Sequence, residues 1–194
     1  IFEHRIYLPS VGFFMAFVGG IYWLVNGERS RNVFIGIVIV LISVYSYLTY
    51  ERNKVWQSKV ALWSDVVQKS PGLLKAHLTL GAAYTEAGNY LEAMKVYDAL
   101  IAQAPNAEAF SNRGNVYSRL GEHDLAIEDY AKSLAINPRS AMAHTNRGDS
   151  YYNKGDFSAA VEDYTKAIEV NPDYYLAYTH RGNAFRSQSK FTLA

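Results

Sequence analysis

Short polar side chains recur at a fixed spacing in the second half of the chain. Asn115, Asp149 and Asn183 follow one another at intervals of 34 residues. An asparagine amide carries both donors and an acceptor, whereas a carboxylate carries acceptors alone. A row of such groups on one surface could hydrogen-bond the backbone of an extended polypeptide with little sequence preference. The chemistry indicated is recognition of a polypeptide, provided that the fold brings the three residues to one side.

The patterns that mark catalysis or metal binding do not occur in the sequence. There is no His-Glu-x-x-His, no Gly-x-Ser-x-Gly and no glycine-rich phosphate loop. His77 and His144 lie about two repeat lengths apart, so they do not share a site. Cysteine is absent, which excludes disulfides and thiolate metal sites. We therefore expect no catalytic residue, no metal and no other cofactor in this chain.

The elements that must position the polar row are internal repeats, at residues 74–105, 107–138 and 141–172, with a partial fourth copy at 175–194. A period of this length is typical of stacked helix pairs. Within each complete repeat, glycine recurs at position 8, alanine at 20, tyrosine at 24 and proline at 32. The small residues let two antiparallel helices approach closely, and the tyrosine fills the space between that pair and the next. The proline ends the second helix.

The helix ends have their own markers. Glycine recurs at position 15, where a helix C-terminus needs a positive φ, as Gly88, Gly121 and Gly155. Asn89 and Asp156 follow as expected N-caps, and Asn89 with Glu92 has the spacing of a capping box. The acidic pairs Glu128–Asp129 and Glu162–Asp163 recur at one repeat position. We interpret both pairs as part of a solvated helix face.

This pattern resembles the tetratricopeptide repeat (TPR) family, in which position 7, here arginine in three copies, is often leucine. The resemblance implies an all-α solenoid, a right-handed superhelix whose concave groove binds peptides or proteins. Positions 9, 12 and 13 usually line that groove, and here they include Asn115, Asp149, Asn183, Ser118, Tyr152, Arg119 and Asn153. We expect the position-9 side chains to face solvent; the alternative is that they support the fold. Asn112 and Asn146, at position 6, could line the groove or brace neighbouring helices.

Charge and composition narrow the class of partner. Charged residues make up only 19% of the chain, and the net charge is +1. No concentrated basic face is indicated, so we expect no nucleic acid. The partial repeat 175–194 lacks a second helix, which would leave an apolar face uncovered, and repeat arrays normally need a polar cap. On that ground we expect a piece of a longer protein.

Two uncharged segments, 8–26 and 33–50, are each long enough for a membrane-spanning helix. The short linker 27–32 would join them as a hairpin, so that residues 1–50 form a membrane domain. A pair of buried helices in a soluble core is the alternative, but neither segment shows a polar face. A secretory signal is a further alternative for 8–26. The membrane lipid bilayer is therefore an expected partner.

Residues 51–73 are predicted to form an amphipathic connecting helix. Trp56, Val60, Trp63 and Val67 follow a helical stripe. Tryptophans just beyond a span suit the membrane interface, and Pro71 stands where a repeat-ending proline would fall. The helix could therefore lie near the bilayer, cap the repeat array at 74–194, or do both.

A second resemblance covers residues 1–71. The run Glu3–Ser10 ahead of a span, and Arg52-Asn53 followed by Trp56, Leu62-Trp63 and Lys69–Pro71, resemble transmembrane-and-TPR proteins related to protein O-mannosyltransferases and their bacterial relatives. The resemblance implies periplasmic or lumenal repeats, whereas the distribution of Lys and Arg leans weakly toward the cytoplasm. Arg5 could contact a lipid phosphate at the membrane surface, because the planar guanidinium suits a phosphate, although an ordinary juxtamembrane loop explains Arg5 as well.

The function predicted from the sequence is a membrane-anchored protein-interaction module that binds an extended polypeptide in its concave groove. The alternative is the C-terminal part of a membrane glycosyltransferase that uses a polyprenyl-phosphate sugar and whose repeats present the acceptor. The acidic catalytic loop of such enzymes has no counterpart in this chain.

Overall fold

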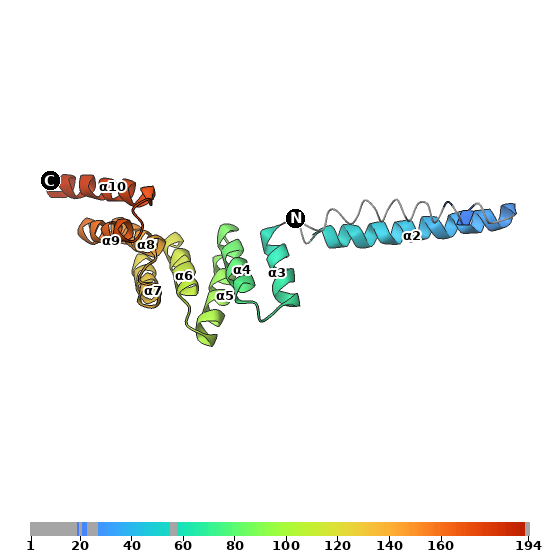
Figure 1. Cartoon of the computed structure of the whole chain (residues 1–194), viewed down its shortest axis with the longest axis horizontal. Helices are drawn as coiled ribbons and strands as arrows, with labels where there is room; N and C mark the ends of the chain where they lie inside the picture. The colour runs from blue at the N-terminus through green and yellow to red at the C-terminus, as the bar shows by residue number, and fades with distance from the viewer. Residues whose placement is uncertain (1–18, 20, 23–26, 55–57, 193–194) are drawn as a thin grey trace. The chain divides into compact units, whose positions relative to one another are not determined.

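A computed structural model describes residues 19, 21–22, 27–54 and 58–192. All the regular secondary structure in this part of the chain is helical, which confirms the all-α fold. The chain divides into two compact units, 1–55 and 56–194, and each is described by itself. The helices of the second unit follow one another in chain order from α3 to α10 (Figure 1).

The described part of the first unit includes the long helix α2 (Glu28–Lys54). Its segment Ser30–Glu51 contains an 18-residue window with a mean hydropathy of 2.1, none of which is buried, so the segment is long and apolar enough to cross a membrane. The predicted span 33–50 lies inside it. The predicted linker 27–32 is shorter than expected, because Glu28 already begins the helix, with its charge at the favourable N-terminal end. The other predicted span, 8–26, falls almost entirely outside the described residues.

The second unit begins with α3 (Lys59–Lys69), which packs on the next helix. The helix predicted over 51–73 is divided, since residues 51–54 are the last turn of α2. Ser58 fixes the start of α3, where its hydroxyl accepts a hydrogen bond from Ala61 N at 3.0 Å. Val60, Trp63 and Val67 are half-buried in α3, while Trp56 lies outside the described residues.

Three helix pairs follow, and a further helix packs on the last of them. The pairs are α4 (Leu74–Glu86) with α5 (Tyr90–Gln103), α6 (Ala107–Arg119) with α7 (His123–Ile136), and α8 (Ala141–Asn153) with α9 (Phe157–Val170). The last helix, α10 (Tyr175–Thr192), packs on α9 and contacts α8. First helices of successive repeats also contact each other, α4 with α6 and α6 with α8.

The glycine at position 8 and the tyrosine at position 24 form the core contact of each complete repeat. A Cβ added at Gly81, Gly114 or Gly148 would lie 2.6, 3.0 or 2.7 Å from the ring of the tyrosine in the same repeat. The rings concerned belong to Tyr97, Tyr130 and Tyr164, each only 1% exposed. The glycine therefore gives the tyrosine its space, and the close approach predicted from the sequence is confirmed.

Most of the predicted helix ends are confirmed. Gly88, Gly121 and Gly155 have φ values of 77°, 81° and 84°, which side chains with a Cβ rarely adopt. The Asp156 carboxylate accepts a hydrogen bond from Ala159 N at 3.0 Å. The capping box at Asn89 is wrong, because the Asn89 side chain makes no cap bond and Glu92 pairs with Lys95 instead.

The interpretation of the acidic pairs is half wrong. Glu128 and Glu162 are exposed and pair with lysines one turn on, as a solvated face would. Asp129 and Asp163, by contrast, are only 2% exposed. Neighbouring helix positions point about 100° apart, so the second acid of each pair faces the first helix of its repeat.

The arginine at position 7 neutralises each buried aspartate. Arg113 donates to both carboxylate oxygens of Asp129, at 2.7 and 2.8 Å, and Arg147 does the same to Asp163, at 2.8 and 2.7 Å. The repeats themselves carried a signal for this pairing. The first repeat has Leu80 and Val96 at these two positions, so both change together from apolar to charged.

Candidate functional site

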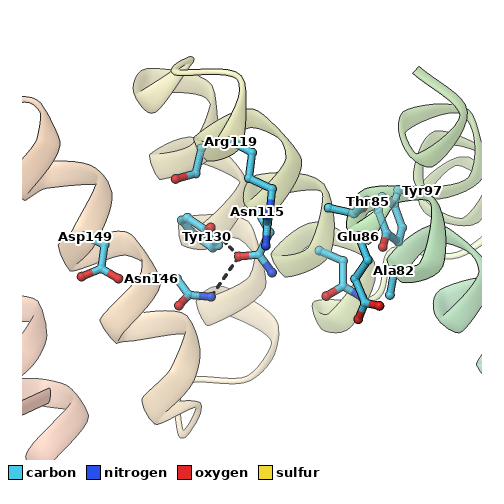
Figure 2. A pocket seen from close by; sticks show the side chains of 11 residues that line it. Ala82, Thr85, Glu86, Tyr97, Asn115, Arg119, Tyr130, Asn146 and Asp149 are labelled. Carbon is cyan, nitrogen blue, oxygen red and sulfur yellow. Dashed lines mark hydrogen bonds between the residues drawn. The ribbon is translucent and has the colours of Figure 1, made fainter. Parts of the chain in front are cut away.

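A polar cavity of about 420 Å³ opens among the first helices of the three complete repeats (Figure 2). Most of its lining comes from α4, α6 and α8, with two tyrosines of the second helices behind them. The lining residues are Ala82, Thr85, Glu86, Tyr97, Asn112, Asn115, Ser118, Arg119, Tyr130, Asn146 and Asp149. Four of the seven residues predicted for the groove, Asn115, Ser118, Arg119 and Asp149, lie in this one cavity.

Asn115 is held in a fixed orientation. Its Oδ1 accepts a hydrogen bond from the Tyr130 hydroxyl at 2.6 Å and another from Asn146 Nδ2 at 2.9 Å (Figure 2). The first bond joins the two helices of one repeat, and the second joins that repeat to the next. Because both partners donate, the amide oxygen must point inward and the Nδ2 donors are left for other partners.

Asp149 occupies the same position one repeat later and is held in the same way. Its Oδ1 accepts from the Tyr164 hydroxyl at 2.8 Å and from His180 Nδ1 at 2.7 Å. A carboxylate only accepts, so His180 carries a proton on Nδ1 in this contact. Asp149 thereby ties α9 and α10 to α8, while more than a third of its side chain stays exposed.

The buried tyrosines remain neutral donors near neutral pH. Burial raises the pKa of Tyr97 to about 12, against a smaller lowering by the Thr85 hydroxyl. Burial also raises the pKa of Tyr130, with the nearby Asp149 carboxylate adding to the effect. The pKa of Tyr164 is raised by burial and by its hydrogen bond to Asp149. The hydroxyls of Tyr130 and Tyr164 therefore keep donating to the position-9 side chains over the physiological pH range.

The charges in the cavity are not equivalent. Glu86 is already paired, since Lys59 Nζ lies 2.6 Å from its carboxylate. Arg119 is exposed and has no ion-pair partner within the described part of the chain. Asp149 meets no lysine or arginine there either. One cationic and one anionic side chain, on α6 and α8, are therefore available to a ligand.

The remaining predicted groove residues lie outside this cavity. The Tyr152 hydroxyl lies 2.9 Å from Ser187 Oγ, and its ring packs edge-on against Phe157 at 5.3 Å between centroids. Asn153 is exposed. The Asn183 amide oxygen accepts from Arg186. Arg5 lies outside the described residues, so its contact with a lipid phosphate stays a prediction.

The expectation that the position-9 side chains face solvent freely is wrong for Asn115 and Asp149. Both are half-buried and both accept internal hydrogen bonds, so they support the fold and line the cavity at once. Sequence reasoning missed the part played by Tyr130 and Tyr164. One signal was present in the sequence: position 9 carries an acceptor, Asn115 or Asp149, in the two repeats whose tyrosine hydroxyl donates to it, whereas the first repeat has Ala82 there.

No set of three or more histidine, cysteine, aspartate and glutamate side chains in the described residues could hold a metal ion. The site consists of hydrogen-bonding groups on a helical scaffold. These groups can bind a ligand through hydrogen bonds.

Comparison with known proteins identifies the repeats. Models described as Tetratricopeptide repeat match residues 75–107, 107–140 and 141–174, which together make up half of the chain. This chain belongs to the tetratricopeptide repeat family. Its TPR array is similar in structure to MamA, with a TM-score of 0.59 and 24% identity over 67% of this chain and 77% of MamA.

Two other TPR structures are similar at the level of the fold. The Sgt2 TPR domain from Aspergillus fumigatus has a TM-score of 0.59 and 24% identity, covering 62% of this chain and 82% of that domain. The first TPR of Spaghetti (RPAP3), solved with the HSP90 peptide SRMEEVD, has a TM-score of 0.55 and 24% identity, covering 56% and 87%.

The curated relatives include protein O-mannosyl-transferases. Protein O-mannosyl-transferase Tmtc2 of Drosophila melanogaster is 31% identical over 105 residues, which is 54% of this chain and 11% of that protein. Protein O-mannosyl-transferase TMTC1 of Mus musculus is 26% identical over 123 residues, 62% of this chain and 13% of that protein. The chain thus spans little more than a tenth of the length of these relatives, and the resemblance stated from the sequence is confirmed.

Proposed function

We propose that this TPR array binds an extended polypeptide along its polar cavity, as a protein-interaction module. The observation that carries the proposal is the cavity itself, which receives polar side chains from the first helices of successive repeats. An extended peptide also repeats its donors and acceptors at regular intervals. The RPAP3 domain of similar fold, solved with an HSP90 peptide, supports this mode of use.

The energetics favour a ligand that crosses several repeats. Each hydrogen bond between neutral groups contributes only about 0.5–1.5 kcal/mol net. A compact ligand at one repeat would therefore bind weakly, whereas a peptide that contacts α4, α6 and α8 together gathers several such bonds. Asn115 and Asp149 are already fixed by internal bonds, so little side-chain entropy is lost when a ligand arrives.

A steric block in the cavity tests this function. Ser118→Tyr places a ring in the cavity, and Glu128→Tyr places the same ring on the exposed side of α7 as a control. Binding of a library of unstructured peptides to the full chain in detergent is measured by fluorescence anisotropy. We expect Ser118→Tyr to abolish binding and Glu128→Tyr to preserve it. Equal binding by both variants would refute a ligand site in this cavity.

We further propose that α2 anchors the array in a membrane. Its apolar segment Ser30–Glu51 leaves its hydrophobic side chains uncovered, and Tyr45, Tyr47 and Tyr50 cluster near its C-terminal end, where aromatic side chains favour the lipid–water interface. Following the similarity to the O-mannosyl-transferases, we place the repeats on the periplasmic or lumenal side, and we take residues 8–26 as the first span of the hairpin.

A second candidate is that the array belongs to a membrane glycosyltransferase and presents its acceptor polypeptide. The similarity to two protein O-mannosyl-transferases favours it. The described residues offer a binding cavity, and the sequence has no counterpart of the acidic catalytic loop that the resemblance implies for such enzymes. We therefore expect purified residues 1–194 to transfer no mannose from a polyprenyl-phosphate donor to a peptide. Transfer above that of a heat-denatured sample would show that this chain carries the catalytic part.

A further inference from the structure

Internal hydrogen bonds decide which atoms the cavity offers to a peptide. At Asn115, the Tyr130 hydroxyl and the Asn146 amide both donate to Oδ1. If the amide turned over, its Nδ2 would face Asn146 Nδ2 and that bond would be lost, because both groups only donate. No hydrogen bond to Asn115 Nδ2 comes from the described residues, so this group presents its N–H donors to the cavity. We call the polar side chain that each first helix places at position 9 a rung. The α6 rung, Asn115, is therefore a hydrogen-bond donor.

The next rung has the opposite character. At Asp149, the Tyr164 hydroxyl and His180 both donate to the same oxygen, Oδ1. The described residues place no donor on Oδ2. A half-exposed carboxylate oxygen on the wall of the cavity carries negative charge and accepts hydrogen bonds only. The α8 rung therefore suits a cation or an N–H donor.

Arg119 strengthens the donor rung. It stands four residues after Asn115 on α6, which puts both on one face of that helix, and both line the cavity. Arg119 has no ion pair among the described residues, and a guanidinium matches a carboxylate with two parallel hydrogen bonds. The other cavity acid, Glu86, forms an exposed ion pair with Lys59. The charges left over are thus one cation on α6 and one anion on α8.

We infer that this cavity selects peptides that carry an acidic side chain for the Asn115–Arg119 rung and a basic side chain for Asp149. The inference rests on the proposed peptide-binding function and names the class of peptide. The bond from Asn146 to Asn115 shows that α6 and α8 are neighbours, and packed helices lie about 8–10 Å apart. An extended chain rises about 3.3 Å per residue, so the two charges belong about three residues apart.

Capped, fluorescein-labelled nonapeptides of glycine, serine and threonine test the inference. One pair carries glutamate and lysine three residues apart, in either order, and further peptides replace the glutamate, the lysine or both by glutamine. Binding to the full chain in detergent is measured by anisotropy. We expect replacement of either charge to weaken binding about tenfold, the effect of losing one charge-assisted hydrogen bond. Binding that does not depend on these charges would overturn the inference.

Two nearly isosteric variants assign each charge to its rung. Asp149→Asn keeps an oxygen for Tyr164 and His180 but removes the negative charge, and Asn115→Asp keeps the oxygen for Tyr130 and Asn146 but removes the donors. We expect Asp149→Asn to abolish the preference for lysine alone, and Asn115→Asp to abolish the preference for glutamate alone. A lysine preference that survives Asp149→Asn in a folded variant would overturn the assignment.

Failure of the charge preference and failure of peptide binding give different results in these experiments. If peptides of every charge bind equally and Ser118→Tyr abolishes their binding, the cavity is a peptide site without the selectivity inferred here. If no peptide binds, or Ser118→Tyr changes nothing, the proposed function itself is wrong. Should a variant fail to fold, the peptide series on the unaltered chain still decides the charge preference.

Discussion

Gly148→Ala should destabilise the array, whereas the corresponding change one repeat later, Gly182→Ala, should not. A Cβ at position 148 would lie 2.7 Å from Cε1 and 2.9 Å from Cδ1 of Tyr164. The Tyr164 ring cannot move aside easily, since the residue is 1% exposed and its hydroxyl donates a hydrogen bond to Asp149. A Cβ at position 182 meets nothing within 4 Å.

The difference in stability between the two variants follows from two opposing effects. Replacing glycine by alanine inside a helix favours folding by about 1 kcal/mol at both positions. Overpacking against a fixed ring costs about 1–3 kcal/mol, and only at position 148. The helix term cancels in the comparison, so Gly148→Ala should be about 1–3 kcal/mol less stable than Gly182→Ala.

Amide hydrogen exchange on the full chain in detergent measures the difference by location, because repeat arrays can open locally. Protection of α8 and α9 should fall in Gly148→Ala and stay unchanged in Gly182→Ala. Equal protection in the two variants would mean that the glycine–tyrosine contact does not limit packing, and the account of the repeat core would be wrong.

Three further predictions concern charge and topology. Arg147→Leu or Asp163→Val alone should lower the free energy of unfolding, measured by urea denaturation, by about 3–5 kcal/mol. The double variant, which has the residue types of the first repeat at these positions, should lower it much less. Burial alone would raise the pKa of Asp163, but hydrogen bonds from Arg147 and His144 lower it overall. The stability that this lowered pKa contributes is complete above about pH 4 and is lost as the pH falls through the lowered pKa. Acid should therefore destabilise the double variant less than the unaltered chain. In this cysteine-free chain, single cysteines at Ser30 and Arg139 should react with an impermeant reagent from opposite sides of a membrane; labelling from one side would exclude a spanning α2.

Much of the fold could be predicted from the sequence because the same physical requirement recurs every repeat. A glycine and an alanine at fixed positions predicted two helices in close contact. The tyrosine was predicted to lie between one helix pair and the next, whereas its ring packs on the glycine of its own repeat. Glycine at position 15 marks a helix end, and its φ near 80° in three repeats follows from that requirement alone. These features are local or periodic along the chain, so the sequence alone was sufficient to predict them.

The tertiary structure determines how residues of similar type, or at the same repeat position, differ in their contacts. Glu128 and Asp129 are adjacent acids, yet the rotation of one residue along α7 exposes the first and buries the second against Arg113. Gly148 and Gly182 occupy the same repeat position, yet a tyrosine ring covers only the first.

The same holds for the candidate site. The sequence placed Asn115 and Asp149 at one repeat position, and it showed that their side chains could bind a peptide. It could not show that a tyrosine from the second helix and a polar residue from the following repeat both donate to one oxygen of each. Those partners lie between 15 and 31 residues away, and only packing brings them together. Which atom remains for a ligand is therefore set by the packing of helices around the cavity.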